Sequence, residues 1–284
     1  MSAELLRRCR FPEPGTAVTC AVSGGPDSLA LLVLAVEAGC AVTAVHVDHG
    51  LRPGSVAEAD VVASAAERFG AEFRGVRVEV LPGSNLEARA RAARHAALPS
   101  GALLGHTMDD LAETVLLNLL RGAALDGLAG FDPAARPLRG IRRSETHALC
   151  AALDLEPVQD PSNGDPIHRR NRVRHELLPL LDAVAERDLV PVLARQAELL
   201  RDDALLLDEL AATLDPTDAA ALAAAPPALA RRAVRRWLRD GPEQHPPDRA
   251  TVDRVLAVAG GGAVACEVGG GRAVRRHRGR LVLT

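Results

Sequence analysis

The protein has 284 residues, of which 48% are hydrophobic and only 2% aromatic, and its net charge at pH 7 is −3. A chain of this length can form one large domain, or a main domain with a smaller one, around a core of alanine, valine and leucine. The five cysteines are scattered and never form a C-x-x-C pair, which argues against a zinc ribbon, an iron–sulfur cluster or a disulfide framework. The first residues lack the apolar core of a signal peptide, and no run is apolar enough to cross a bilayer, so a cytoplasmic enzyme is expected.

The positive charge is carried by arginine, because the sequence contains no lysine. The arginines gather in four stretches, at residues 139–143, 169–174, 231–239 and 272–280. These stretches could bind an anionic polymer despite the acidic total, although composition alone would also produce some clustering.

The motif Ser23-Gly24-Gly25-Pro26-Asp27-Ser28 predicts a phosphate-binding loop. It follows an apolar run at residues 17–22 that is typical of a strand and precedes a run at residues 29–35 that is typical of a helix. Two adjacent glycines let the backbone approach an anion, and the free N–H groups of the new helix then point at it. Ser23 and Ser28 add hydroxyl donors, and Asp27 suits such a site if Mg²⁺ on a nucleotide lies between it and the phosphates. The structural alternative is a capped helix after a Gly-Gly turn.

A second apolar run, at residues 41–48, contains His46 and ends at Asp48. Ligands of open parallel sheets bind beyond the carboxyl ends of the strands, so Asp48 is expected to face the same crevice as the phosphate loop. His46 is equally compatible with a packed core histidine. Residues 57–69 and 85–95 predict helices, with a strand at residues 72–80 between them. Arg91 and Arg94 are three residues apart and therefore share a face of the later helix. The same spacing would also occur on a basic face that is only exposed to solvent.

A further helix is expected to begin near residue 107 and to carry polar side chains on, or just ahead of, one face. These side chains are His106, Asp109, Asp110 and Glu113. Its separate apolar stripe consists of Ala112, Val115, Leu116 and Leu119. Acids in a first turn also complement the helix dipole, but that explains neither the histidine nor the third acid. Beside a phosphate-binding loop, holding and deprotonating an amine is a better interpretation of this cluster than binding a metal.

The phosphate-loop motif resembles the S-G-G-x-D-S signature of the PP-loop ATP pyrophosphatases, which cleave ATP between its α and β phosphates. Three later blocks resemble one branch of that family, the tRNA(Ile)-lysidine synthetases: H-V-D-H-G-L-R at residues 46–52, H-x-x-D-D-x-x-E-T at residues 106–114 and R-N-R-x-R-H-x-L-L-P at residues 170–179. Departures include Thr107 in place of a common histidine and His95 in place of a tyrosine. The resemblance spans about residues 17–180.

This resemblance implies an α/β fold: a Rossmann-like parallel sheet of the PP-loop ATPase type, with a smaller, mainly helical C-terminal domain. It implies that ATP activates carbon 2 of the wobble cytidine in the CAU anticodon of tRNA(Ile), and that the amine of free lysine then displaces AMP. The expected cofactors are ATP and Mg²⁺, with Asp27 as a ligand of the metal. The expected nucleotide-binding residues are Ser23, Gly24, Gly25, Pro26, Asp27, Ser28, His46 and Asp48. The expected catalytic residues are Asp27, His106, Asp110 and Glu113, with His106 or a neighbouring acid as the base. The expected substrate contacts are Arg91, Arg94, Asp109, Asp110, Glu113, Arg172 and Arg174.

Residues 1–180 are expected to form the catalytic domain, and residues 181–284 a helical domain that positions tRNA. In the latter we expect a long helix that reaches about Leu214, further helices at residues 231–239 and 248–259, and a final β-hairpin. Candidate phosphate contacts there are Arg235, Arg236, Arg239, Arg275 and Arg276. No membrane partner is expected. A homodimer is compatible with the sequence.

Three other functions are compatible with an ATP loop. A PP-loop tRNA thiolase would need a catalytic cysteine pair or cluster ligands, so Cys150 would have to act alone. An amide synthetase for small adenylated molecules would have little use for the basic run at residues 169–174. A module that only binds nucleotides would not need the acids between His106 and Glu113.

Overall fold

The computed structural model describes residues 2–48, 50, 55–78, 89, 92–93, 96–158, 164–239 and 247–284. Arg91, Arg94 and most of the helix expected at residues 85–95 lie outside the described residues. The chain forms two compact units, residues 1–198 and residues 199–284, and each is described by itself below.

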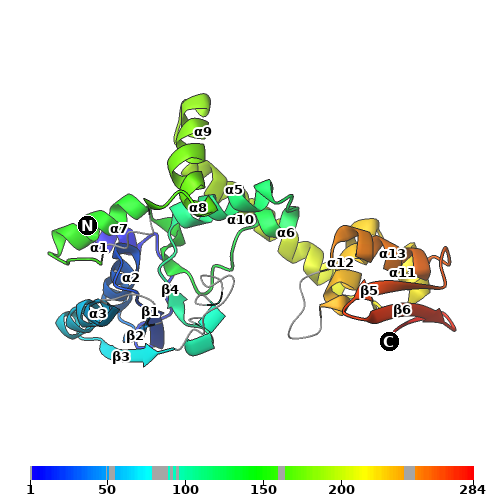
Figure 1. Ribbon diagram of the computed structural model, residues 1–284, viewed down its shortest axis with the longest axis horizontal. Helices are drawn as coiled ribbons and strands as arrows, with labels where there is room; N and C mark the ends of the chain where they lie inside the picture. Colours follow the sequence, from blue (N-terminus) through cyan, green and yellow to red (C-terminus); the bar gives the residue numbers. More distant parts are fainter. Residues whose placement is uncertain are drawn as a thin grey trace. The chain divides into compact units, whose positions relative to one another are not determined.

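The first unit is built on a parallel sheet whose strands have the order β3-β2-β1-β4 (Figure 1). The strands are β1 (Ala17–Ala21), β2 (Ala41–Asp48), β3 (Glu72–Arg77) and β4 (Leu103–Leu104). Helices α2 (Pro26–Glu37) and α3 (Ser55–Phe69) contact each other and pack on strands β1 to β3. The Rossmann-like parallel sheet expected from the sequence is therefore confirmed.

The middle of helix α2 is covered by other elements on all sides. Residues 28–35 are buried, and the helix contacts the sheet, α3 and helix α7 (Arg143–Ala152). A helix in such a position needs no polar face. Its leucines belong to one core cluster with Leu149 of α7 and Leu5 of the short N-terminal helix α1 (Ser2–Leu6).

The helix expected near residue 107 is α5 (Met108–Leu120), with Thr107 as its N-cap. Its apolar stripe differs from the expected one, because Leu111 is buried whereas Leu119 is exposed. Shorter elements follow α5 in the first unit: α6 (Leu125–Leu128), the 3₁₀ helix η1 (Pro137–Gly140), α8 (Arg169–Arg172), the π-helix η3 (Val173–Leu177) and α9 (Leu178–Ala185).

The long helix expected from Leu180 to about Leu214 is in fact two helices, α9 and α10 (Val190–Ala212). The chain leaves α9 at Glu186, whose φ of 54° is left-handed. The side chain of Asp188 then accepts the N–H of Val190 at 3.0 Å, which starts α10. Leu178 and Val190 pack in a cluster with Ala112 of α5. The residues directly after 180 therefore belong to the compact unit that holds the sheet.

The second unit contains helices and a small antiparallel sheet. Its elements after α10 are α11 (Ala219–Ala224), α12 (Pro227–Leu238), α13 (Arg249–Ala259), β5 (Ala265–Gly269), β6 (Arg272–His277) and β7 (Arg280–Leu283). The hairpin expected around residues 269–271 is present as β5 and β6, but a second tight turn at Arg278 and Gly279 divides its second arm and creates a third strand. Both turn residues have positive φ, 48° and 78°, which is the geometry of a type I′ hairpin turn.

Candidate active site

The phosphate-loop motif and the segment at His106 leave neighbouring strands at one edge of the sheet. Ala21 at the end of β1 lies opposite Leu104 at the end of β4. Strand β2 lies on the other side of β1, so the order of connection reverses between β1 and β4. Such a switch point is where open parallel sheets bind ligands. The two segments that the sequence singles out therefore start side by side.

The phosphate loop depends on its first glycine. Gly24 has a φ of 87°, and its carbonyl accepts the N–H of Val158 at 3.0 Å. A Cβ atom at this position would lie 2.9 Å from Cγ2 of Val158. Gly25 is the N-cap of α2 and Pro26 occupies its first turn. The loop therefore ends at the positive end of a buried helix, which is favourable for an anion.

The two serines of the loop fix its shape. The Ser28 hydroxyl donates to the Gly25 carbonyl at 2.9 Å and accepts the N–H of Ser23 at 3.1 Å. The two serine hydroxyl oxygens are 3.3 Å apart. Ser28 is buried, so its hydroxyl chiefly serves the internal hydrogen bonds of the loop.

Asp27 lies in the first turn of α2 and is the charged group of the loop. Its carboxylate accepts the hydroxyl of Thr146 and lies 3.4 Å from Nε of Arg143. Burial raises the pKa of Asp27, although Thr146 and Arg143 oppose the rise. Nucleotide-bound Mg²⁺ in proteins takes one or two carboxylates together with phosphate oxygens. The partly exposed carboxylate beside the loop fits that role.

Asp110 has a structural and an electrostatic function at once. One carboxylate oxygen accepts the N–H of Thr107 at 2.9 Å in a capping box, and the other lies 2.8 Å from Nη2 of Arg143. Burial disfavours its ionised form, but Arg143, His106 and the Thr107 N–H outweigh that effect and lower the pKa of Asp110. Asp110 is therefore a stable anion at neutral pH.

Glu113 is completely buried and is surrounded by arginines. Its carboxylate lies 2.9 Å from Nη1 of Arg143, 3.0 Å from Nε of Arg170 and 2.8 Å from Nε of Arg174. Arg170 also donates to the Thr114 hydroxyl at 2.8 Å. A buried carboxylate is tolerated only with such partners. The structure thus places Glu113 at the centre of an arginine cluster.

Arg143 joins the two segments of the site, and sequence reasoning missed its role. Its single guanidinium contacts Asp27 of the phosphate loop as well as Asp110 and Glu113 of α5. Burial disfavours its charge, but the three carboxylates outweigh burial and raise its pKa. The sequence placed Arg143 only in a basic stretch. No local pattern showed that it turns inward, because its partners are 30 to 116 residues away in the chain.

We use the name carboxylate–arginine cluster for Asp27, Asp110, Glu113, Arg143, Arg170 and Arg174. Three carboxylates and three guanidinium groups meet there, so the formal charges balance. Arg170, like Arg143, was not among the residues selected from sequence.

Asp109 points away from this cluster. Its carboxylate lies 3.1 Å from Nε of Arg142 and accepts the backbone N–H of Arg143 at 2.8 Å. Asp109 therefore connects the start of α5 to the start of α7. Through that backbone contact it positions the Arg143 side chain.

The remaining site candidates make other contacts. His46 is buried, and its Nδ1 donates to the Val22 carbonyl at 2.9 Å, an assignment that follows from the acceptor. Asp48 accepts the N–H of Gly50 at 2.7 Å. The His106 ring packs on Phe131, with 5.4 Å between the ring centroids. Arg172 faces outward and pairs with Glu176 at 3.0 Å, so it does not join Arg174 at Glu113.

Cys150 has the surroundings of a structural thiol. It is buried and donates to the Pro26 carbonyl at 3.4 Å. Burial raises its pKa to about 11. Because the thiolate is the nucleophile, such a cysteine is poorly suited to sulfur transfer.

Fold, loop and cluster together define a PP-loop nucleotide-binding protein, and a PP-loop domain model matches residues 3–181. The U34-tRNA thiolase of Methanococcus maripaludis has the same fold, with a TM-score of 0.59 and 21% identity over 70% of this chain and 78% of that one. A model described as the TilS substrate binding domain matches residues 218–282.

The chain belongs to the tRNA(Ile)-lysidine synthase family. It is 46% identical to the tRNA(Ile)-lysidine synthase of Nocardia farcinica over 298 residues, which cover 96% of this chain and 93% of the relative. It is 42% identical to that of Mycobacterium tuberculosis H37Rv, over 92% of this chain and 89% of the relative. No helix in the described part of the chain is long and apolar enough to span a membrane.

Proposed function

We propose that this protein ligates lysine to carbon 2 of the wobble cytidine in the CAU anticodon of tRNA(Ile), in the cytoplasm. ATP first adenylates the base with release of pyrophosphate, and the lysine amine then displaces AMP. The observation that carries this proposal is the contact of one guanidinium, Arg143, with both the phosphate-loop acid and the two acids of α5. Nucleotide chemistry and amine chemistry can then take place within the reach of one side chain.

The first step needs a bound triphosphate. The Gly24-Gly25 turn and the N-terminus of α2 would hold its phosphates, and Asp27 would hold the Mg²⁺ that accompanies them. When bound, Mg²⁺ would supply positive charge beside the phosphates of the leaving pyrophosphate. Buried guanidinium groups of the carboxylate–arginine cluster would stabilise the charge that develops on the α phosphate.

The second step needs an ammonium site, and Asp110 and Glu113 supply two buried carboxylates. Both are already neutralised by arginines, so a lysine ammonium must replace one guanidinium to bind there. The displaced guanidinium then becomes available to the phosphate of the adenylated base, and the charge of the site stays balanced. His106, which is near enough to Asp110 to influence its pKa, would take the proton that the attacking amine loses.

The experiment is a reconstitution with ATP, radiolabelled lysine and a tRNA(Ile) transcript. We expect pyrophosphate release and label in RNA with a CAU anticodon, and no label when the wobble cytidine is replaced by uridine. Asp27→Ala should abolish pyrophosphate release while the protein still binds RNA. Glu113→Gln should leave adenylation measurable and reduce the use of lysine. A wild-type protein that releases pyrophosphate without labelling RNA would contradict the proposal.

A further inference from the structure

The basic run at residues 169–174 has two faces. Arg170 and Arg174 are four residues apart and both turn inward to Glu113. Arg169 and Arg172 are exposed and point the other way. This division follows from helical geometry, since residues four apart share a face. The inward pair is part of the carboxylate–arginine cluster, whereas the outward pair takes no part in it.

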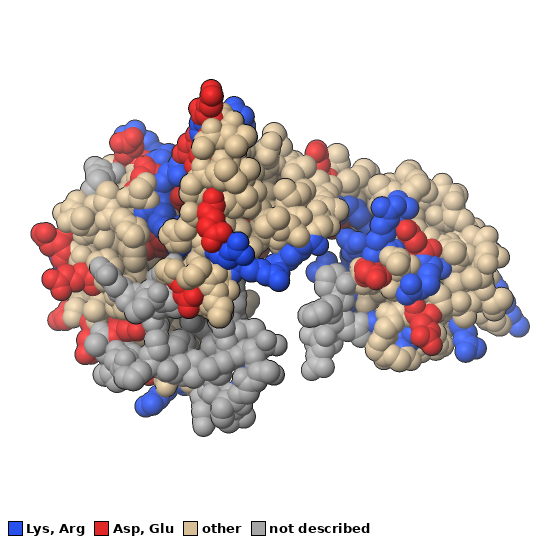
Figure 2. Space-filling model, turned by 45° about the horizontal axis from the view of Figure 1, so that its top comes forward, with Lys and Arg blue, Asp and Glu red and all other residues tan. Residues whose placement is uncertain are grey.

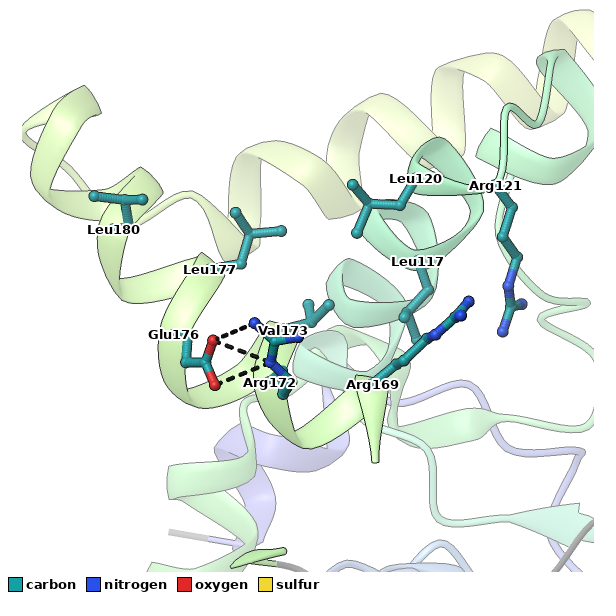
Figure 3. Close-up of a pocket in the computed structure, with 9 residues that line it drawn as sticks. All are labelled: Leu117, Leu120, Arg121, Arg169, Arg172, Val173, Glu176, Leu177 and Leu180. Atoms are coloured by element: carbon teal, nitrogen blue, oxygen red, sulfur yellow. Dashed lines mark hydrogen bonds and ion pairs between the residues drawn. The ribbon is translucent and has the colours of Figure 1, made fainter. Parts of the chain in front are cut away.

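The outward pair borders a groove of about 480 Å³ between the last turns of α5 and the helical segment α8–η3–α9 (Figure 3). We call it the leucine–arginine groove, and its lining residues are Leu117, Leu120, Arg121, Arg169, Arg172, Val173, Glu176, Leu177 and Leu180. Leucines of α5 face leucines of η3 and α9 across it, with arginines along one side (Figure 3). Its volume suits a ligand the size of a nucleotide.

Two of the groove's leucines are unusually exposed: Leu120 is 68% exposed and Leu180 is 59% exposed. A concave apolar surface of this kind, rimmed by charged groups, marks a binding site more often than scattered exposed leucines do. Figure 2 shows that, on the face it presents, basic and acidic side chains are interspersed over a largely uncharged surface. The charges of the groove itself must therefore identify its ligand.

Those charges favour a polyanion. Three arginines line the groove against one acid, and that acid, Glu176, is paired with Arg172. Arg121 and Arg169 have no ion-pair partner among the described residues. The Arg172–Glu176 pair is solvent-exposed, and such pairs contribute little to stability, so a phosphate can compete for Arg172.

We propose that the leucine–arginine groove binds single-stranded nucleotides of the anticodon loop that flank the modified cytidine. This inference rests on the proposed function. Arg121, Arg169 and Arg172 would contact phosphates, and the leucines would cover the face of an unstacked base. Arg169 of the groove directly precedes Arg170 of the carboxylate–arginine cluster in the chain. A strand that delivers one base to the cluster therefore has a site for its neighbours.

The test is binding of a tRNA(Ile) transcript by full-length variants, measured by fluorescence anisotropy over a range of salt concentrations. Arg121→Gln/Arg169→Gln should bind about tenfold more weakly, and the slope of log affinity against log salt should fall by about 1.4 for two lost single-strand phosphate contacts. Leu120→Ser/Leu180→Ser should weaken binding without changing that slope, because no phosphate contact is lost. Matched controls are Arg74→Gln on β3 and Leu206→Ser on α10, which are also exposed and should bind like wild type.

Wild-type affinity and salt slope in the double arginine variant would overturn the inference. So would a leucine double variant that binds RNA normally but loses self-association in analytical ultracentrifugation, because the groove would then be an interface between two copies. ATP binding should be unchanged in every variant. Lysine incorporation by the wild type tests the proposed function separately: if wild type labels RNA and the groove variants bind it normally, only the groove assignment fails.

Discussion

At the residue scale, the chemistry of the site depends on Arg143, whose partners come from two segments that are far apart in sequence. Its side chain is mostly buried, as are its three carboxylate partners. The planar guanidinium can contact several carboxylates at once, whereas an ammonium is a single point charge. The position is therefore specific for arginine and not only for positive charge.

We expect Arg143→Met to lower the free energy of unfolding by about 3 kcal/mol, because buried Asp110 loses its guanidinium partner and Asp27 and Glu113 each lose one ion-pair contact. Arg143→Lys should recover only part of this loss. Urea denaturation measures the free energy of unfolding of both variants. Arg74→Lys, an exposed change on β3, should be neutral. Full recovery by lysine would show that charge alone is required.

The lowered pKa of Asp110 gives a stability contribution with a defined pH dependence. Consider a carboxyl group whose pKa is lower in the folded protein than in the unfolded protein. It stabilises the fold at pH values above its unfolded pKa, and this contribution is lost as the pH falls through its folded pKa. The stability advantage of wild type over Asp110→Asn should thus be constant from pH 5 to 8. It should shrink below about pH 4, near the ordinary pKa of aspartate.

The measurement is denaturant unfolding of both proteins from pH 3 to 8. Asp60→Asn, at an exposed position on α3, provides the comparison for a general effect of removing one carboxylate. An advantage of wild type over Asp110→Asn that grows on acidification would contradict the assignment.

At the scale of elements, the site depends on the close approach of the end of β4 to the start of α2. A Cβ atom on Gly105 would lie 2.7 Å from the carbonyl oxygen of Asp27 and 3.1 Å from Cα of Ser28. The crowded atoms are backbone, so relief requires a shift of the phosphate loop itself. Asp109 makes a similar connection between α5 and α7 through its contact with the Arg143 N–H.

Gly105→Ala should therefore weaken ATP binding about tenfold and destabilise the fold by about 1–3 kcal/mol, as overpacking does. Isothermal titration with ATP and thermal unfolding measure these effects. Gly164→Ala is the matched control, since none of the described residues lies within 4 Å of the added Cβ atom there. Normal ATP affinity in Gly105→Ala would show that the loop does not depend on this contact.

At the scale of the whole molecule, the two units have separate cores. Leu31 belongs to the cluster around α2, and Leu238 belongs to the cluster formed by α11, α12, α13 and the second sheet. Separate cores predict separate cooperative transitions on heating.

Leu238→Ala should lower the midpoint of one calorimetric transition, with a loss of about 3 kcal/mol in that unit. Leu31→Ala should lower the other. ATP should raise only the transition that Leu31→Ala affects, because the phosphate loop lies in the first unit. Equal shifts of both transitions in either variant would mean that the units unfold together.

The sequence by itself determined the parts of this protein that depend on local pattern. The glycine pair of the phosphate loop, the acids at helical spacing on α5 and the apolar run of α2 all follow from backbone sterics and periodicity, and the family follows from their order. Strand β7 was missed, although the Arg278-Gly279 turn is a local signal for it.

Only the tertiary structure decided which of the polar residues meet. Arg143 and Arg170 contact Glu113, whereas Arg172 faces outward, although the sequence did not distinguish these arginines. Asp109 connects two helices, although the sequence did not distinguish it from the other acids of α5. The physical reason is that buried charges require partners, and those partners come from segments that the sheet brings together across more than one hundred residues.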